Sequence, residues 1–482
     1  MSLMILGTAS HVGKSTIVAA ICRSLSRRNI IVAPFKSQNM SLNSYVTKDE
    51  AEIGIAQAMQ AFAAMAEPKA EMNPILLKPK GEQTSQVVLL GKPYKDVKIS
   101  DYYKETEYLL NIAEESYRKL ESEYNNIVVE GAGSAAEINL YDRDIANILL
   151  AKRIRLPIII VGDIERGGIF AQIIGTYELL PNDVKENVCG FIINKFRGDA
   201  QLFNDGIKII EEKTGLPVLG VLPYTKISIP SEDSLSINDK KEGDFPVKIA
   251  IIRLPRISNF SDFEILENYA SVDYVEPENE IDKYDCIIIP GTKNTVDDLQ
   301  ELKKHDFDRK IQLARIKKIP IIGICGGYQM LGKKILDEGF ESGEKNTFYG
   351  FGLLDVETTF DDYQKTTVQV KRRANSIGPI LSSAGEADGY EIHMGKTLLN
   401  TTKEAFFGDG AVSEDGLVIG TYMHGLFKNI NVADALLKYL YSQKKLHFPG
   451  ITNNDSEASY NSLSEHFENN VDINKILCYF NQ

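Results

Sequence analysis

The residue best suited to covalent chemistry in this sequence is Cys325. The run 320–332, PIIGICGGYQMLG, places this cysteine directly after an apolar segment of strand character and before a segment of helical character. A tight strand-to-helix turn exposes a side chain, and the N-terminus of the following helix favours the thiolate over the thiol. Gly326 and Gly327 allow such a turn, so the pattern predicts a nucleophile rather than a buried structural cysteine.

A thiolate that attacks an amide requires a proton-transferring base and N–H donors for the oxyanion. We predict His424 as the base, since it follows the apolar segment Leu417–Ile419 about a hundred residues after the cysteine. Gly291, which follows the apolar run Cys286–Ile289, and Gly326 are expected to donate the two oxyanion N–H groups. This order of groups resembles that of class I glutamine amidotransferases, in which the cysteine releases ammonia from glutamine.

The residues after the histidine depart from that pattern. Many class I glutamine amidotransferases carry a proline and a glutamate there, and the glutamate orients the imidazole. Here Gly425, Leu426 and Phe427 follow, so no carboxylate is supplied at that point. The sequence therefore does not identify the group that orients His424. A second histidine, His393, is interpreted as structural or close to the substrate, not as catalytic.

A phosphate-binding loop is predicted near the N-terminus. Residues 7–16, GTASHVGKST, follow an apolar strand and precede the helical segment Ile17–Leu25. In this setting small residues let backbone N–H groups converge on phosphate oxygens, and the helix N-terminus adds favourable partial charge. Thr8 stands where the strict motif has glycine, a variant found in the dethiobiotin synthetase group. The predicted ATP-binding residues are Gly13, Lys14, Ser15 and Thr16.

A Mg²⁺ ion is expected to accompany the nucleotide, with Lys14 holding the terminal phosphates and Ser15 binding the metal. Hard cations prefer oxygen ligands, and carboxylates at the ends of strands that face the loop are suitable. Glu130, directly after an apolar strand, and Glu52 are the expected carboxylate ligands. Asp163 is a weaker third candidate, and each of these carboxylates could instead cap a helix.

Several polar segments follow one another in an order that carries more information than any one of them. They are Pro34–Asn43, Glu52–Gln57, Met72–Pro79, Glu130–Ser134, Asp163–Phe170, Asn194–Gly198 and Glu232–Ser234. Together with the cysteine and histidine segments they resemble the cobyric acid synthase family, and the resemblance covers nearly all of the first half. The lack of a carboxylate after the histidine also fits this branch of the amidotransferases.

The resemblance implies a glutamine- and ATP-dependent ligase of vitamin B12 biosynthesis. The implied substrate is adenosylcobyrinic acid a,c-diamide, amidated at its b, d, e and g carboxylates after activation by ATP as acyl phosphates. ATP and Mg²⁺ are the implied cofactors, glutamine is the nitrogen donor, and the partner is a small-molecule corrinoid. A solvated polar loop is an equal alternative for each candidate substrate-binding residue. These candidates are Lys36, Gln38, Asn39, Asn43 and Arg166.

Three other functions were compared with this one, and the first and the last of them stay as alternatives. Cobyrinic acid a,c-diamide synthase has the same architecture. Its phosphate-binding half typically has a different sequence after the first strand pair, so the block Lys36–Asn43 argues against it. A CTP synthetase-like ligase would need nucleotide-recognition segments that are not found. A non-enzymatic P-loop switch ATPase could use a similar phosphate loop, but it would have no use for Cys325 and His424.

Two α/β domains are needed to position these groups. In residues 1–235 short apolar runs alternate with helical periodicity, which predicts a doubly wound parallel sheet. The resemblance of the phosphate loop implies that this domain is of the dethiobiotin synthetase-like P-loop type. Residues 236–246 are polar and bounded by glycine and proline, as in a linker. The alternation resumes in residues 247–445, which predicts a second α/β domain. The resemblance of the Cys325 and His424 segments implies a class I glutamine amidotransferase domain with a flavodoxin-like fold. In the tail, residues 446–482, the apolar segment Ile473–Phe480 is either a docking helix or a weakly ordered terminus.

The composition supports a multidomain enzyme and argues against some partners. Of 482 residues, 43% are hydrophobic and 25% charged, values close to the average for globular proteins. A formal net charge of −13 argues against a general binder of nucleic acid or of an anionic membrane. Five widely spaced cysteines, and no apolar run of the ~18 residues that span a membrane, predict a cytoplasmic protein. The oligomeric state is not predicted.

Overall fold

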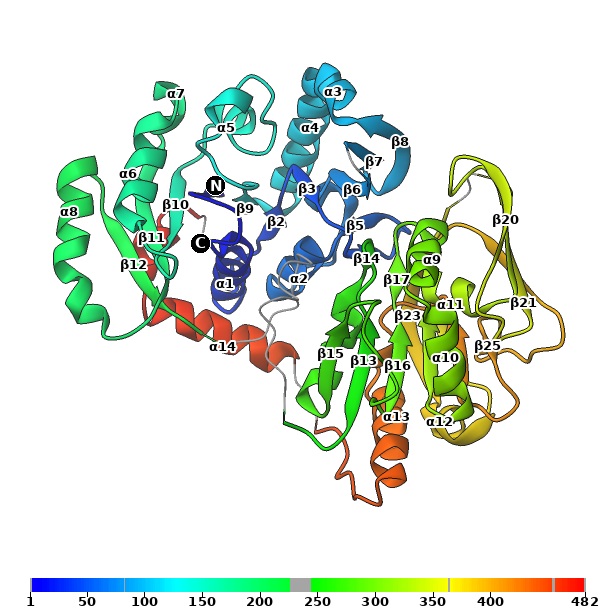
Figure 1. Cartoon of the computed structure of the whole chain (residues 1–482). Helices are drawn as coiled ribbons and strands as arrows, with labels where there is room; N and C mark the ends of the chain where they lie inside the picture. Colours follow the sequence, from blue (N-terminus) through cyan, green and yellow to red (C-terminus); the bar gives the residue numbers. More distant parts are fainter. Residues whose placement is uncertain (1, 82, 226–243, 363–364, 453–455, 481–482) are drawn as a thin grey trace.

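The computed structural model describes residues 2–81, 83–225, 244–362, 365–452 and 456–480. Two six-stranded sheets organise it, one in each half of the chain, with helices packed around them (Figure 1). The block Glu232–Ser234 and residues 236–243 of the predicted linker lie outside the described residues.

The first sheet has the strand order β12-β11-β10-β1-β9-β2, and all its neighbouring strands are parallel. The strands are β1 (Ser2–Gly7), β2 (Ala33–Phe35), β9 (Ile127–Glu130), β10 (Ile158–Asp163), β11 (Val188–Phe196) and β12 (Val218–Pro223). Every residue of β1, β9 and β10 is buried, as expected for parallel strands that are covered on both faces. The predicted doubly wound sheet is confirmed.

Helices cover this sheet, and a smaller sheet extends it toward the second half (Figure 1). The helices are α1 (Lys14–Ser26), α2 (Ile55–Ala63), α3 (Ile99–Tyr102), α4 (Thr106–Tyr124), α5 (Ile148–Ile154), α6 (Ile169–Leu179), α7 (Asn182–Lys185) and α8 (Asn204–Thr214). The small sheet contains β3 (Gln38–Met40), β6 (Ile75–Gly81), β7 (Thr84–Leu89) and β8 (Lys92–Lys98), and a separate antiparallel pair is formed by β4 (Ser44–Val46) and β5 (Glu52–Gly54).

The second sheet has the order β15-β13-β16-β18-β26-β25, and its strands are parallel except for the last pair. These strands are β13 (Lys248–Ile252), β15 (Ser271–Val275), β16 (Cys286–Ile289), β18 (Ile321–Ile324), β25 (Ala411–Val412) and β26 (Val418–Thr421). The helices around it are α9 (Thr295–Lys304), α10 (Phe307–Ile316), α11 (Gly326–Leu331), α12 (Gly378–Ala384) and α13 (Ile430–Gln443).

Shorter strands complete the second half. One is an antiparallel pair of β22 (Thr366–Arg373) and β23 (Glu386–His393). Another is a four-stranded sheet of β19 (Lys334–Glu338), β20 (Lys345–Tyr349), β21 (Val356–Phe360) and β24 (Lys396–Leu399). A two-residue pair, β14 (Ile257–Ser258) with β17 (Gly291–Thr292), brings two loops together at the carboxyl end of the large sheet.

The C-terminal tail returns to the first half. Helix α14 (Ser456–Glu468) packs along α1 (Figure 1). Helix α15 (Ile473–Leu477) follows it in sequence. Arg23 Nε donates to Asn461 Oδ1 over 2.8 Å, and the hydroxyls of Ser24 and Ser464 lie 2.9 Å apart. The segment Ile473–Phe480 also docks, because Ile476 and Phe480 are buried in the core that contains α1. The longer helix α14 was not predicted from the polar sequence before it.

Candidate active site

Cys325 lies in a strained turn between β18 and α11. Its backbone angles, φ 53° and ψ −111°, are unfavourable for a residue with a side chain. The turn depends on its neighbour Gly327, where a Cβ atom would lie 2.0 Å from the carbonyl oxygen of Ile289. Since the strain is held in place by such close packing, the turn presents the sulfur in a fixed direction, as predicted for a nucleophile.

His424 is buried beside the cysteine and is oriented by Asp262. Its Nδ1 lies 2.9 Å from Asp262 Oδ2, while Asp262 Oδ1 accepts the backbone N–H of Gly425 over 3.0 Å. Both side chains are 1% exposed. Burial lowers the pKa of His424, but hydrogen bonds with Asp262 and Cys325 raise it more, from 6.5 to about 9. The geometry favours a protonated imidazole paired with a carboxylate on one side and the sulfur on the other.

Sequence reasoning missed Asp262, the group left unidentified for orienting His424. The aspartate belongs to a 3₁₀ turn, Phe260–Phe263, more than a hundred residues before the histidine. Its immediate neighbours, in the run NFSDFE, follow no spacing that marks a catalytic carboxylate. Only the fold brings this turn next to the loop that follows β26.

The two glycines predicted to supply oxyanion donors lie at the same place. A Cβ atom at Gly291 would lie 2.8 Å from His424 Cε1, so the glycine packs directly against the imidazole. A Cβ atom at Gly326 would lie 2.7 Å from Thr292 Cγ2, so the turn after Cys325 packs against the segment that contains Gly291. The prediction that both glycines are close to the reacting groups is therefore consistent with the structure.

Cys325 opens onto a cavity between the two halves of the chain. Its lining residues are Lys78, Lys80, Ser258, Asn259, Thr292, Lys293, Thr295, Cys325, Gln329, Glu341, Phe360, Lys365, Ile392, His393 and Met394. The ring of His393 stacks on Tyr422 with centroids 3.7 Å apart, which agrees with a structural or substrate-proximal position. The thiol is thus not enclosed in hydrocarbon alone.

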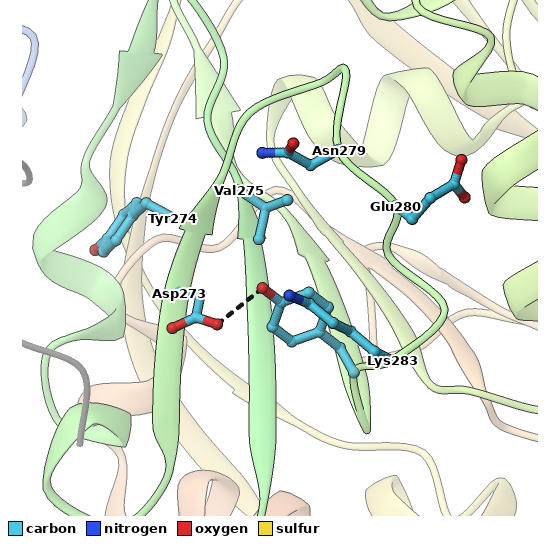
Figure 2. Close-up of a pocket in the computed structure, with 7 residues that line it drawn as sticks. Asp273, Tyr274, Val275, Asn279, Glu280 and Lys283 are labelled. Atoms are coloured by element: carbon cyan, nitrogen blue, oxygen red, sulfur yellow. Dashed lines mark hydrogen bonds between the residues drawn. The ribbon is translucent and has the colours of Figure 1, made fainter. Parts of the chain in front are cut away.

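A second hollow lies elsewhere in the same half, beside β15 (Figure 2). It includes Asp273, Glu280, Lys283 and Tyr284, and the Tyr284 hydroxyl donates to Asp273 Oδ2 over 2.8 Å. No residue predicted to have a chemical role lines this hollow, so the cavity at Cys325 is the better candidate for a substrate site.

The lysine of the phosphate-binding loop is held by backbone carbonyl groups. Lys14 Nζ donates to the carbonyl oxygens of Ala9 (3.0 Å) and Gly133 (2.7 Å) and is 6% exposed. Gly13, with φ 97°, provides the left-handed turn into α1, whose first residues include the half-buried Ser15 and Thr16. The four predicted ATP-binding residues therefore form one continuous loop and helix start.

Glu130 lies against this loop, as predicted. Its Oε1 accepts from Ser15 Oγ over 2.8 Å and from Lys36 Nζ over 2.9 Å, and Gln60 donates to its other oxygen. The carboxylate is 1% exposed. A hydroxyl and a carboxylate oxygen side by side are the hard ligands that Mg²⁺ prefers next to nucleotide phosphates. These residues therefore fit Mg²⁺, although no cluster of three or more His, Cys, Asp or Glu side chains suited to a metal occurs in the described part of the chain.

The structure gives the other two predicted metal ligands different partners. Glu52 is fully buried, and its two oxygens accept from the ammonium groups of Lys78 and Lys365. Asp163 Oδ2 accepts from Lys195 Nζ over 2.9 Å. Only Ser15 and Glu130 are brought into mutual contact, so the geometry does not support Glu52 as a metal ligand.

The candidate substrate-binding residues also separate into groups. Lys36 pairs with Glu130; Asn39 is buried and donates to Gln57 Oε1 over 3.0 Å; and Gln38 accepts from the Tyr102 hydroxyl over 2.5 Å. Arg166 is exposed in the loop before α6. Asn43 is buried too, at 1% exposure, and it contacts the other half of the chain.

The contact made by Asn43 fixes the turn that carries Asp262. Asn43 Oδ1 accepts the N–H of Phe260 over 3.1 Å, and the N–H of Ser44 donates to Asn259 Oδ1 over 2.8 Å. The Tyr390 hydroxyl also donates to the Ser44 carbonyl over 2.9 Å. The first half of the chain therefore supports the residues that hold the histidine of the second half.

Comparison with known proteins agrees with both parts of the site. Residues 3–236 match the family of CobQ/CobB/MinD/ParA nucleotide binding domains, and residues 248–432 match the CobB/CobQ-like glutamine amidotransferase domain. The fold and the site together define a glutamine-dependent ligase with a nucleotide-binding domain. Proteins named "Probable cobyric acid synthase" are 60% identical in Methanoculleus marisnigri (100% of this chain, 99% of the relative), 61% in Methanosphaerula palustris (99% and 98%) and 55% in Methanosarcina acetivorans (98% and 98%). The chain belongs to the cobyric acid synthase family, which confirms the resemblance seen in the sequence.

A further finding concerns membranes. No helix within the described residues is both long and apolar enough to cross one.

Proposed function

We propose that the chain converts the b, d, e and g carboxylates of adenosylcobyrinic acid a,c-diamide into carboxamides, with glutamine as nitrogen donor and ATP as activating agent. The observation that carries this proposal is the direct docking of a Cys325–His424–Asp262 arrangement onto a domain with a phosphate-binding loop. The choice of a corrinoid rests on membership of the family.

In the second half, we assign Cys325 as the nucleophile. As a thiolate it attacks the side-chain amide carbon of glutamine, and the N–H groups of Gly291 and Gly326 stabilise the oxyanion. The protonated His424, held by Asp262, gives its proton to the departing ammonia. Water then releases glutamate from the thioester.

In the first half, the carboxylate is activated before the ammonia arrives. Carboxylates are poor acyl donors, so ATP transfers a phosphoryl group to the oxygen and creates a better leaving group. Lys14 would stabilise charge on the terminal phosphates, while Ser15 and Glu130 would hold Mg²⁺. When bound, this ion neutralises charge on the phosphoryl group. Ammonia attacks the acyl phosphate, and phosphate leaves.

The division of labour between the halves predicts different effects for two substitutions. Cys325→Ala should abolish amidation with glutamine but spare amidation with ammonia, whereas Lys14→Ala should abolish both. Mass spectrometry of products from the a,c-diamide measures each amidation as a fixed mass change. Loss of both reactions in Cys325→Ala would contradict the assignment. Unchanged a,c-diamide with the wild-type protein, ATP, Mg²⁺ and ammonia would contradict the synthase activity.

We also propose that the reaction takes place in the cytoplasm. The five cysteines of the described chain are all free of disulfides, as expected where thiols stay reduced.

A further inference from the structure

The cavity next to Cys325 contains more lysines than buried carboxylates can balance. Lys78 and Lys80 reach it from β6 of the nucleotide-binding half, and Lys293 and Lys365 from the other half. Glu52 accounts for two of them, because its oxygens pair with Lys78 and Lys365. Lys80 Nζ lies 2.6 Å from Asp96 Oδ2, so Lys293 is the lysine of this cavity that is left to meet a charged ligand.

Lys293 is the cation without a carboxylate partner. It is half-buried, it lines the cavity, and its Nζ donates to the neutral amide oxygen of Gln86 over 2.7 Å. Among the described residues no carboxylate lies within 4.0 Å of this ammonium. Burial, followed by repulsion from the three other lysines of the cavity, lowers the pKa of Lys293 well below its usual value. An anionic ligand that binds next to Lys293 would stabilise the charged form of this buried amine.

Glu341 is the complementary group in the same cavity. One of its carboxylate oxygens accepts the backbone N–H of Thr295 over 2.6 Å. Burial raises the pKa of Glu341 to about 7, while Lys293 and Lys80 act in the opposite direction. No ion pair within 4.0 Å joins Glu341 to Lys293, although both residues belong to the described chain and line one cavity. The cavity thus presents a separated anion and cation close to the nucleophile.

We propose that this cavity binds the amino-acid head group of glutamine, with Glu341 holding the α-ammonium and Lys293 the α-carboxylate. The proposal rests on the proposed role of Cys325 in attacking the side-chain amide. With the amide at Cys325, the remainder of the substrate extends into the cavity as a zwitterion, and one charge of each sign is available to meet it. Simple amides without these charges would leave both protein groups unpaired, so the pair selects for glutamine.

The nucleotide-binding half contributes directly to this site. Gln86 of β7 holds the Lys293 ammonium, and the Lys80 carbonyl accepts from Arg256 Nε over 3.0 Å. The strands that carry these residues lie next to β14 and β17 (Figure 1). Glutamine binding is therefore complete only when the two halves are docked.

The experiment compares wild-type protein with Glu341→Gln and Lys293→Met by measuring glutamate or product release from three amides. These are L-glutamine, glutaramic acid, which lacks the α-ammonium, and L-glutamine α-amide, which lacks the α-carboxylate. We expect each substitution to raise KM for glutamine about 10- to 100-fold, with a smaller change in kcat. Glu341→Gln should lose only the preference for glutamine over glutaramic acid, and Lys293→Met only the preference over the α-amide.

Glu280→Gln and Lys283→Met serve as matched controls, since both residues lie in the separate hollow of Figure 2. They should keep both preferences. If the wild type hydrolyses glutamine and the two cavity variants keep the wild-type preferences, the proposal is overturned while the role of Cys325 stands. If the wild type, supplied with corrinoid, ATP and Mg²⁺, releases no glutamate, the proposed function itself fails. A selective loss for each variant supports the assignment, because a general structural defect would weaken all three substrates together.

Discussion

Replacing Asp262 with asparagine tests the reaction geometry most directly. The neutral amide keeps the shape of the side chain but removes the negative charge that faces His424 Nδ1 at 2.9 Å. The His424 pKa, raised from 6.5 to about 9, corresponds to roughly 3 kcal/mol of preference for the protonated imidazole. The hydrogen bond with Asp262 makes the largest favourable contribution to that preference, so its loss should return the pKa of His424 toward 6.5 or below.

The direction of the pH effect follows because the protonated form of His424 donates the proton to the departing ammonia. Wild-type glutaminase activity should persist up to about pH 9 and fall as His424 loses its proton. In Asp262→Asn the same decline should begin near pH 6 to 7, which reduces activity at pH 8 roughly 30-fold for a pKa near 6.5. Ammonia-dependent amidation should be unaffected, because it bypasses the histidine.

The assay is glutamate release from pH 6 to 10, with Asp273→Asn as a control that removes a carboxylate at the hollow of Figure 2. Stability provides a second measurement. A histidine with a raised pKa stabilises the fold fully below its unfolded value of 6.5, and this contribution is lost as the pH rises through about 9. Asp262→Asn should therefore lower Tm more at pH 6 than at pH 9.5. An unchanged alkaline decline near pH 9 would refute the reasoning.

Three further substitutions address other parts of the site. Glu130→Gln should abolish amidation with either nitrogen source, because Lys36 loses its buried counterion and the nucleotide loop loses a carboxylate; isothermal titration with Mg·ATP measures the accompanying loss of binding. Gly291→Ala should reduce glutamine-dependent activity about 100-fold and spare the ammonia-dependent reaction, since its methyl group would displace the His424 ring; parallel assays with the two nitrogen sources measure this. Phe467→Ala should destabilise the protein by about 3 kcal/mol through a cavity under α14, which urea unfolding measures.

Features encoded locally could be predicted from the sequence. The turn at Cys325 and the loop ending at Ser15 each combine a strand, small residues and a helix within one short segment, so the backbone geometry follows from neighbouring residues. Glu130 was also predictable, since the strand before it ends at the edge of the sheet where ligands bind.

Features that depend on distant packing could not be predicted. Asp262 becomes a partner of His424 only because the first half of the chain holds its turn through Asn43. Glu52 was predicted as a metal ligand from its position after the phosphate loop, yet its two lysine partners come from β6 and from the segment before β22. Nothing near a buried carboxylate in sequence reveals whether a metal or an ammonium will neutralise it.

The return of the tail to α1 has a consequence for dividing this polypeptide. Helix α14 follows the amidotransferase half in sequence but buries Tyr460, Leu463 and Phe467 with residues of the nucleotide-binding half. Dividing the chain between the halves would leave the apolar face of α14 exposed on the C-terminal fragment. It would also expose the surface of the N-terminal fragment against which α14 packs. A functional version divided into two polypeptides would therefore need α14 on the first polypeptide, although the helix lies near the end of the intact chain.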